Sequence, residues 1–182
     1  MNPNPKFRLQ GIMLASLVFI ADQIVKYAML GPLQLKSRGV IHIISFFDLR
    51  YAENRGVSMS FLTADNDGER WALVALTAVI AAGVAVWMWR EKLRGDVLAL
   101  SLVLGGALGN IVDRVRYGYV VDYADLHIGA FRPFYIFNLA DACISIGVLI
   151  LLARAFLISD KQTGDGADVQ QPESSADIVE KS

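Results

Sequence analysis

The stretch WALVALTAVIAAGVAVWMW, residues 71–89, has no charged side chain in 19 residues. A helix needs about 20 residues to cross a hydrocarbon core of ~30 Å. Inside lipid every backbone polar group must be satisfied internally, so an apolar run of this length predicts a membrane-spanning helix. Residues 71–89 therefore place the chain among membrane proteins.

Three further apolar runs follow the same pattern. VLALSLVLGGALGNIV (97–112) has no charged residue, and PFYIFNLADACISIGVLILLA (133–153) has only Asp141. The third of these runs, residues 9–30, lies near the N-terminus. With their ends included, the predicted spans are 9–30, 70–89, 97–115 and 133–155.

The first run, residues 9–30, follows Lys6 and Arg8, as the apolar core of a removable signal peptide would. It is long for such a core, and no small-residue cleavage site follows it. We therefore expect it to be retained as the first span. Its polar interruptions are Asp22, Gln23 and Lys26.

The composition agrees with a small membrane protein. Of 182 residues, 54% are hydrophobic and 19% are charged, and the formal net charge is −1. There is no basic stripe, so nucleic-acid binding is not expected. The single cysteine, Cys143, excludes an intrachain disulfide and a cysteine-based zinc site. Its position in an apolar run is typical of a small core residue.

Basic residues near the span ends predict the direction of the helices. The short connection REKLRGD, residues 90–96, carries three basic side chains. Since the number of spans is even, this connection and both termini lie on one side, the cytoplasm. The segments 31–69 and 116–132 then lie on the outer, periplasmic side.

The outer segments have their own patterns. GVIHIISFFDLRYAEN (39–54) is rich in β-branched and aromatic residues between turn-prone ends, which predicts short strands at the membrane surface. DYADLHIGAF (122–131) is amphipathic. We expect the sheet-like segment 33–62 to form a cradle and residues 122–131 a lid beside a site at this surface.

The chain is thus predicted to be one membrane domain, residues 1–158, followed by an acidic tail. The tail, residues 159–182, is rich in Gly, Ser and Asp and is expected to be disordered and cytoplasmic. The predicted fold class is a mainly α membrane protein. It has four transmembrane helices, a small periplasmic β-sheet cradle and a short periplasmic amphipathic lid segment.

Polar residues gather at the outer ends of the predicted spans. Asp22 and Lys26 are four residues apart on a helix, so they share a face and can form an ion pair. Gly105 and Gly109 have the GxxxG spacing that permits close helix approach. The outer polar layer comprises Asp22, Gln23, Lys26, Asn54, Arg55, Asn110, Asp113, Arg114, Asp122, Asn138 and Asp141.

Asp122 and Asp141 differ from the other members of this layer, because neither has a cation one helical turn away. A carboxyl group in dry surroundings without a counter-ion has a raised pKa, and two such groups brought together share a proton. One could take a proton from an attacking water while the other polarises a peptide carbonyl. The pair titrates as a unit, so the acid and the base stay unassigned.

Other hydrolytic chemistries fit less well. His42 and His127 do not belong to an HExxH pattern, so zinc hydrolysis has little support. A Ser–Lys dyad would need Lys26 to reach a serine of the 54–61 segment, but Asp22 already lies one turn from it. The GxGD signature of presenilin-type proteases is absent around Asp122.

Two readings without hydrolysis stay open at this point. An ion- or proton-coupled transporter would place polar groups at the midplane and show repeated halves. A scaffold would use Asn and Asp side chains as hydrogen-bonding contacts between helices. For Asp22, Lys26, Asn110, Asp113 and Arg114, a structural role fits as well as a direct one.

Five motifs occur in order along the chain: DQIVK (22–26), NRGVSMSF (54–61), GGALGNIVDR (105–114), VVDYADLH (120–127) and FNLAD (137–141). Together, over about residues 22–145, they resemble lipoprotein signal peptidases, the bacterial signal peptidase II family. The resemblance implies an aspartic endopeptidase that removes signal peptides from prolipoproteins. The cut would fall before a lipobox cysteine that carries diacylglycerol.

The resemblance also implies roles for single residues. The aspartates of the family's VVD and NxAD motifs fall on Asp122 and Asp141, which would be catalytic. NRGVSMSF departs from the usual NxGAAF form after Gly56, although Asn54 and Gly56 still match. Positions that match site support or substrate contact are Asp22, Lys26, Asn54, Gly56, Asn110, Asp113, Arg114 and Asn138.

The family reading carries further expectations about partners and place. It implies no cofactor and no metal. The partners would be prolipoproteins and membrane lipid, and we expect a monomer. The chain would be a multi-pass protein of the bacterial inner membrane, with both termini in the cytoplasm and the site near the periplasmic face.

Overall fold

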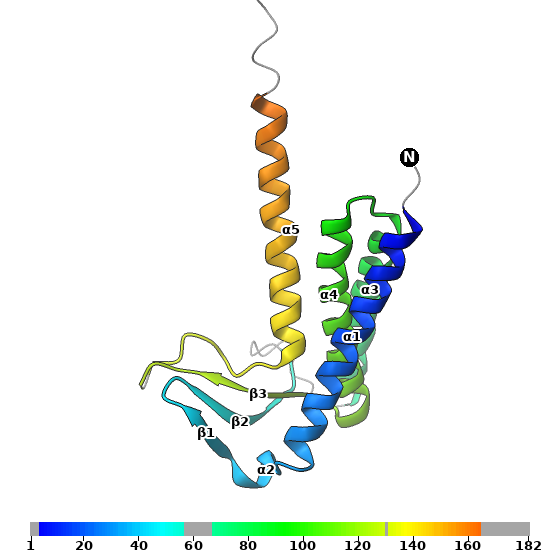
Figure 1. Ribbon diagram of the computed structural model, residues 1–182. Helices are drawn as coiled ribbons and strands as arrows, with labels where there is room; N and C mark the ends of the chain where they lie inside the picture. The colour runs from blue at the N-terminus through cyan, green and yellow to red at the C-terminus, as the bar shows by residue number, and fades with distance from the viewer. Residues whose placement is uncertain (1–3, 57–66, 130, 165–182) are drawn as a thin grey trace, which may run out of the picture.

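A computed structural model of the protein describes residues 4–56, 67–129 and 131–164. Four long helices stand side by side, and a small sheet lies at one end of them (Figure 1). All four are long and apolar enough to cross a membrane, as predicted. The elements are α1 (Pro5–Leu30), α2 (Leu35–Arg38), β1 (Val40–Ile44), β2 (Phe47–Asn54), α3 (Asp67–Arg90), α4 (Arg94–Tyr117), β3 (Val120–Leu126) and α5 (Leu139–Gly164).

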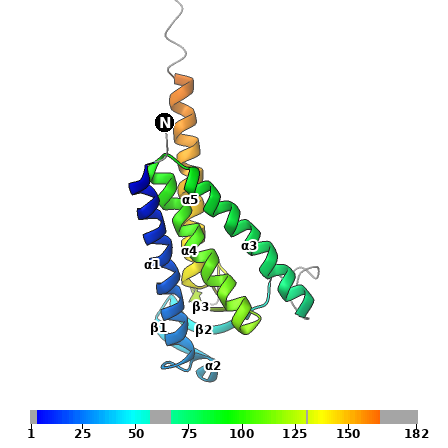
Figure 2. The ribbon, with the colours of Figure 1, turned by 90° about the vertical axis from the view of Figure 1, so that its right-hand side faces the viewer.

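Helix α4 is the centre of the bundle and packs against α1, α3 and α5. Two adjacent glycines allow this. A Cβ atom on Gly105 would lie 2.6 Å from the Ala15 carbonyl oxygen of α1, and one on Gly106 would lie 2.5 Å from the Ala140 carbonyl oxygen of α5. Figure 2 shows α3 slanting away from α1 toward the end that carries the sheet.

The sheet has the order β1-β2-β3, and both strand pairs are antiparallel. The predicted strands within residues 39–54 are therefore confirmed. Leu35, Tyr123 and Ala124 form its buried core, and Val25 and Met29 at the end of α1 pack against them. The sheet is thus fixed to the end of α1, and its far end, which carries the β1–β2 turn, projects sideways past α5 (Figure 1).

The expected lid needs correction. Residues 122–126 belong to β3 and form the third strand of the sheet, with Asp122 opposite Ala52 and Leu126 opposite Phe47. Residues 120–125 of this strand are buried, so its polar members Asp122 and Asp125 lie inside the protein rather than on the exposed face of a separate helix or flap. Only residues 127–131 of the predicted lid lie beyond the strand.

The fourth span also differs from its predicted bounds. Helix α5 begins at Leu139 rather than at residue 133, because Phe137 is held in extended pairing with β3. The Phe137 carbonyl accepts the N–H groups of Tyr123 at 3.1 Å and Ala124 at 2.7 Å. At its other end α5 continues to Gly164, since neither glycine nor proline occurs between residues 148 and 163. Residues 159–164 of the predicted tail are therefore helical, and 165–182 lie outside the described residues.

Candidate active site

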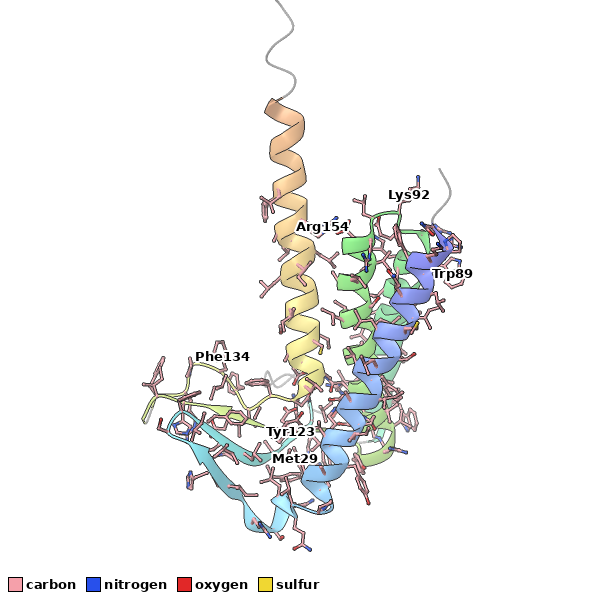
Figure 3. All side chains as sticks on the ribbon, in the orientation of Figure 1. Met29, Trp89, Lys92, Tyr123, Phe134 and Arg154 are labelled. Carbon is pink, nitrogen blue, oxygen red and sulfur yellow. The ribbon has the colours of Figure 1, made fainter. Side chains whose placement is uncertain are left out.

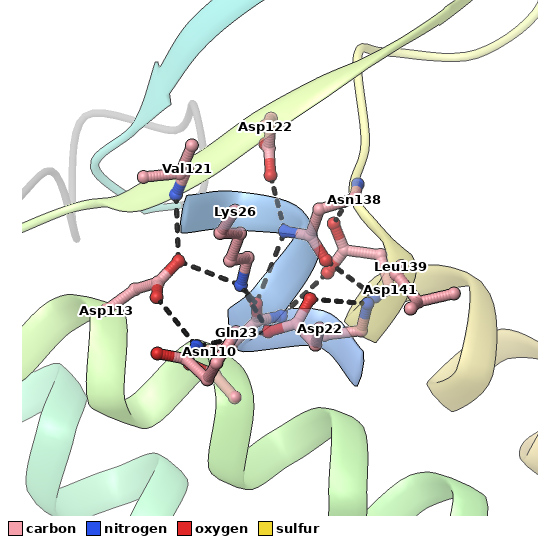
Figure 4. Close-up of polar contacts among 12 residues, drawn as sticks. Asp22, Gln23, Lys26, Asn110, Asp113, Val121, Asp122, Asn138, Leu139 and Asp141 are labelled. Atoms are coloured by element: carbon pink, nitrogen blue, oxygen red, sulfur yellow. Dashed lines mark hydrogen bonds and ion pairs between the residues drawn. The ribbon is translucent and has the colours of Figure 1, made fainter. Parts of the chain in front are cut away.

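Polar side chains from four elements meet at the sheet end of the bundle (Figure 4). Helix α1 contributes Asp22 and Lys26, α4 contributes Asn110 and Asp113, β3 contributes Asp122, and the start of α5 contributes Asn138 and Asp141. All of these except Asp141 are buried, and Asp141 is partly buried. Most of the predicted polar layer therefore forms one cluster, but Arg55 does not belong to it, because it is exposed and pairs with Glu53 at 2.8 Å.

Lys26 is the central cation of the cluster. Its Nζ atom lies 2.8 Å from Asp22 Oδ2, 2.8 Å from Asp113 Oδ2 and 3.1 Å from Asn110 Oδ1. A lysine ammonium has three donors, so all three are used. The predicted Asp22–Lys26 pair is confirmed, and Asp113 shares the same cation.

The two carboxylates on Lys26 also bind backbone groups of the neighbouring elements. Asp22 Oδ1 accepts the Ala140 N–H at 3.1 Å, and Asp113 Oδ2 accepts the Val121 N–H at 3.1 Å. Through these bonds α1 holds the first turn of α5, and α4 holds β3 immediately before Asp122. The Lys26 cluster thus fixes the two elements that carry Asp122 and Asp141.

Two amide side chains join this cluster to the aspartate pair. Asn110 Nδ2 donates to Asp141 Oδ1 at 2.8 Å. Asn138 is fully buried, and its Nδ2 donates to Asp122 Oδ1 at 2.6 Å and to Asn110 Oδ1 at 3.3 Å. An amide that donates to a carboxylate favours the ionised form of that group.

Asn138 and Asp141 also cap helix α5. The Asp141 N–H donates to Asn138 Oδ1 at 2.9 Å, while Asp141 Oδ2 accepts the Asn138 N–H at 3.2 Å. This reciprocal pair has the form of a capping box, with aspartate at the third helical position. The Leu139 N–H donates to the Tyr123 hydroxyl at 3.0 Å. With Asp22 on Ala140, three N–H groups at the start of α5 are satisfied by side chains of the cluster.

Asp122 is only 3% exposed, and its environment changes its acidity. Burial raises the pKa of Asp122 to about 7, and the nearby charge of Asp141 acts in the same direction. Hydrogen bonds from the side chains of Asn138 and Asn54 oppose the rise in the pKa. At neutral pH a proton is therefore available at this carboxyl group, next to a second carboxylate.

Arg114 and the Asn54 motif lie beside the pair. The Arg114 charge interacts with Asp141 and Asp122, while its buried Nε has no hydrogen-bond partner in the described part of the chain. Asn54 Oδ1 accepts the Gly56 N–H at 3.1 Å, and Gly56 has a φ of 129°, which favours glycine. Residues 57–61 of the motif, including both serines considered for a Ser–Lys dyad, lie outside the described residues.

Two members of the cluster were missed as site residues from the sequence. Gln23 Nε2 donates to Asp113 Oδ1 at 3.1 Å and to Asp22 Oδ2 at 3.3 Å. Its polarity within an apolar run was the available signal. Tyr123 gave no such signal, because a tyrosine in a strand is ordinary; its position follows only from the pairing of β3 with Phe137.

The two histidines lie away from the cluster. His42 Nδ1 is 2.9 Å from Asp48 Oδ1, and His127 Nε2 is 3.1 Å from Asp48 Oδ2, without hydrogen-bond geometry in the second case. Among the described residues, no group of three or more His, Cys, Asp or Glu side chains could hold a metal ion.

Comparison with known proteins identifies the family. The family model of signal peptidase (SPase) II matches residues 14–157. The chain belongs to the signal peptidase II family. It is therefore a peptidase, and its four long apolar helices make it a multi-pass membrane protein.

Relatives in this family are close in sequence. The chain is 58% identical over 151 residues to the lipoprotein signal peptidase of Sphingopyxis alaskensis, covering 83% of this chain and 87% of that protein. It is 59% identical over 150 residues to the lipoprotein signal peptidase of Rhizorhabdus wittichii, covering 82% and 87%.

Solved structures of bacterial membrane enzymes have the same fold. One, at 26% identity, superposes with a TM-score of 0.68 and covers 91% of this chain and 94% of its own. Another, at 28% identity, has a TM-score of 0.69 and covers 80% and 92%.

Proposed function

We propose that this chain removes signal peptides from prolipoproteins and that Asp122 and Asp141 are its catalytic residues. The substrate class follows from the relatives that are named lipoprotein signal peptidases. The observation that carries the catalytic assignment is that Asn138 joins both carboxylates, through its side chain to Asp122 and its backbone N–H to Asp141. Both groups thereby keep a fixed position relative to one another.

The pair suits hydrolysis by water in its singly protonated form. The ionised carboxylate takes a proton from water as the water oxygen bonds to the peptide carbonyl carbon. The protonated carboxyl group donates a hydrogen bond to the carbonyl oxygen, whose negative charge grows as the bond forms. When the carbon–nitrogen bond breaks, the leaving nitrogen receives a proton from the pair. A pKa of about 7 at Asp122 keeps this shared proton available at neutral pH.

Arg114 and Asn54 are proposed to act on the substrate side of the pair. Arg114 has a donor without a partner in the described residues and lies within reach of the charges of both aspartates. Such a donor can stabilise the developing oxyanion. Asn54 is held by the turn at Gly56 and hydrogen-bonds to Asp122.

The remaining polar residues are positioning residues. Asp22 holds α5 and Asp113 holds β3 through backbone N–H groups, Lys26 pairs with both carboxylates, and Asn110 holds Asp141. Their geometry restricts both carboxylates to one arrangement. Placement within about 0.5 Å is what such catalysis requires.

The position of the pair agrees with a substrate that is itself a membrane helix. The cluster joins α1, α4, β3 and the start of α5 (Figure 4), and these elements meet at the end of the bundle where the sheet begins (Figure 1). We propose that this end faces the periplasm of a bacterial inner membrane and that both termini are cytoplasmic. A signal helix and the acyl chains of a diacylglyceryl cysteine would then reach the site from the lipid. The cut would fall before that cysteine, and a single copy of the chain carries the whole site.

The test uses the full-length protein in proteoliposomes with a diacylglyceryl-modified prolipoprotein. Asp122→Asn and Asp141→Asn should each lower the cleavage rate by ~10²–10⁴-fold or more, because an acid or base is lost. The matched control is Asp96→Asn at the other end of the bundle, where Asp96 pairs with Arg154. If either variant folds and still cleaves at the wild-type rate, the assignment of Asp122 and Asp141 as catalytic residues is wrong.

A further inference from the structure

The far end of the sheet combines exposed apolar side chains with arginines. In the segment that leads from β3 to α5, Ile128 is 72%, Phe131 65%, Phe134 62% and Tyr135 92% exposed. Ile44 and Phe46 at the β1–β2 turn are 49% and 53% exposed. An exposed apolar patch outside the membrane spans needs an explanation in a stable protein.

Arginines occur within the same region, and a buried carboxylate fixes their position. Asp125 is fully buried and accepts Arg50 Nε at 2.9 Å and Arg132 Nε at 3.1 Å. The two arginine side chains are still 38% and 42% exposed. In the described part of the chain, the terminal Nη groups of neither arginine have a hydrogen-bond partner. Asp125 and the two guanidinium groups together carry one net positive charge and leave several donors unused, while the neighbouring carboxylate of Asp48, opposite Asp125 in the sheet, contacts His42 and His127.

The height of this region relative to the membrane can be read from the helices. Trp71 on α3 is 52% exposed, and Trp87 and Trp89 are each 51% exposed. From Trp71 to Trp89 a helix rises about 27 Å, close to the thickness of a bilayer core. Exposed tryptophans at both ends are typical of the two membrane interfaces. The outer interface therefore lies near Trp71.

The apolar segment lies close to that interface. Arg70, next to Trp71, donates to the Arg114 carbonyl at 2.9 Å, and Arg114 follows Asn110 by one helical turn. Asn110 is bonded to Asp141, so the start of α5 is near the height of Trp71. Figure 3 shows Phe134, five residues before α5, on the side of the sheet from which α5 rises into the membrane.

We propose that this end of the sheet is a membrane anchor: Phe131, Phe134 and Tyr135 enter the outer lipid leaflet, and Arg50 and Arg132 together bind a phospholipid phosphate. Two guanidinium groups that share one buried carboxylate are pre-organised, so little side-chain entropy is lost when they bind a phosphate. The anchor fixes the height of β3 relative to the lipid.

Lipid binding by the arginines is measured by native mass spectrometry of the full-length protein titrated with phosphatidylglycerol. Arg50→Gln with Arg132→Gln should weaken lipid binding by roughly 10- to 30-fold, from two lost basic contacts. The control, Lys36→Gln with Arg38→Gln, removes the same charge from α2, and binding should stay near wild type. Equal binding by the two double variants would overturn the arginine–phosphate contact.

Depth in the membrane is measured with an environment-sensitive fluorophore on a single cysteine, in a Cys143→Ala background. Phe134→Cys is compared with Lys36→Cys, which lies on α2 with a side chain 60% exposed. In proteoliposomes with brominated phospholipid, the label at 134 should be quenched and blue-shifted, and the label at 36 should not. Equal quenching at both positions would overturn the anchor. A blue shift of the label at 134 that occurs only after a prolipoprotein is added would show that the substrate, rather than lipid, covers this patch.

Discussion

Gly109 of α4 is the position where helix packing and the polar cluster are most directly coupled. A Cβ atom there would overlap Asp22 Oδ2 and lie 3.1 Å from Asp22 Cγ. Asp22 is fully buried and is bonded to Lys26 and to the Ala140 N–H, so it cannot move away without breaking these bonds. Gly109→Ala is therefore expected to displace a carboxylate that holds the first turn of α5.

The expected loss of stability follows from these contacts. Overpacking in a tight core costs ~1–3 kcal/mol, and a weakened hydrogen bond to a charged group costs ~1.5–3 kcal/mol. Replacing glycine by alanine in a helix returns up to ~1 kcal/mol. The net loss is about 1.5–5 kcal/mol, which corresponds to a fall in Tm on the order of 10 °C.

The assay follows thermal unfolding in detergent with a thiol-reactive dye, because Cys143 is the single cysteine and is partly buried. Gly83→Ala is the matched control, since a Cβ atom on Gly83 of α3 meets nothing within 4 Å. Its Tm should be unchanged or slightly raised. Cleavage of a lipidated prolipoprotein should fall in Gly109→Ala only. Equal Tm and equal activity of the two variants would refute the reasoning.

Three other predictions concern the same cluster. Asn138→Ala removes a hydrogen-bond donor from Asp122 and a cap from α5, so cleavage should fall by ~10²-fold. The lost donor favours the ionised form of Asp122, so the pKa of Asp122 should rise and the alkaline limb of the pH–rate profile should move to higher pH; an unmoved limb would contradict the contact. Burial raises the pKa of Asp122 from 3.8 to about 7, so the native state binds more protons than the unfolded state in that interval. The free energy of unfolding should therefore decline by on the order of a few kcal/mol as pH rises from 5 to 8. Thermal unfolding at several pH values should show this decline in the wild type and not in Asp122→Asn. The same pH dependence in both proteins would argue against a raised pKa at Asp122. Lys26→Met leaves the buried carboxylates of Asp22 and Asp113 without their cation and should lower the free energy of unfolding by ~3–5 kcal/mol. Adding Asp113→Asn should recover part of this loss in thermal unfolding. No recovery would mean that Lys26 and Asp113 do not interact.

Much of this architecture could be predicted from local patterns. The spans follow from apolar runs, because lipid excludes unpaired backbone groups over a fixed thickness. The Asp22–Lys26 pair follows from helical spacing, and the β1–β2 hairpin from its β-branched and aromatic residues. These features depend on residues close together in the chain.

The errors occurred where distant segments decide local structure. Residues 122–126 were predicted as part of a lid but pair with β2, and residues 133–138 were predicted as helix but include Phe137, which pairs with Ala124. In both cases the competing hydrogen bonds come from a segment that sequence periodicity does not identify. The same limitation hid Tyr123 as a partner of the Leu139 N–H.

The sequence by itself determined that the chain crosses a membrane four times, that its polar residues gather at one end, and that Asp122 and Asp141 lack a local counter-ion. Only the tertiary structure decided how that layer is connected: Lys26 between Asp22 and Asp113, and Asn138 between Asp122 and Asp141. The physical reason is that hydropathy and helical spacing are properties of neighbouring residues. A buried hydrogen bond depends on side chains up to 118 positions apart, as between Asp22 and Ala140.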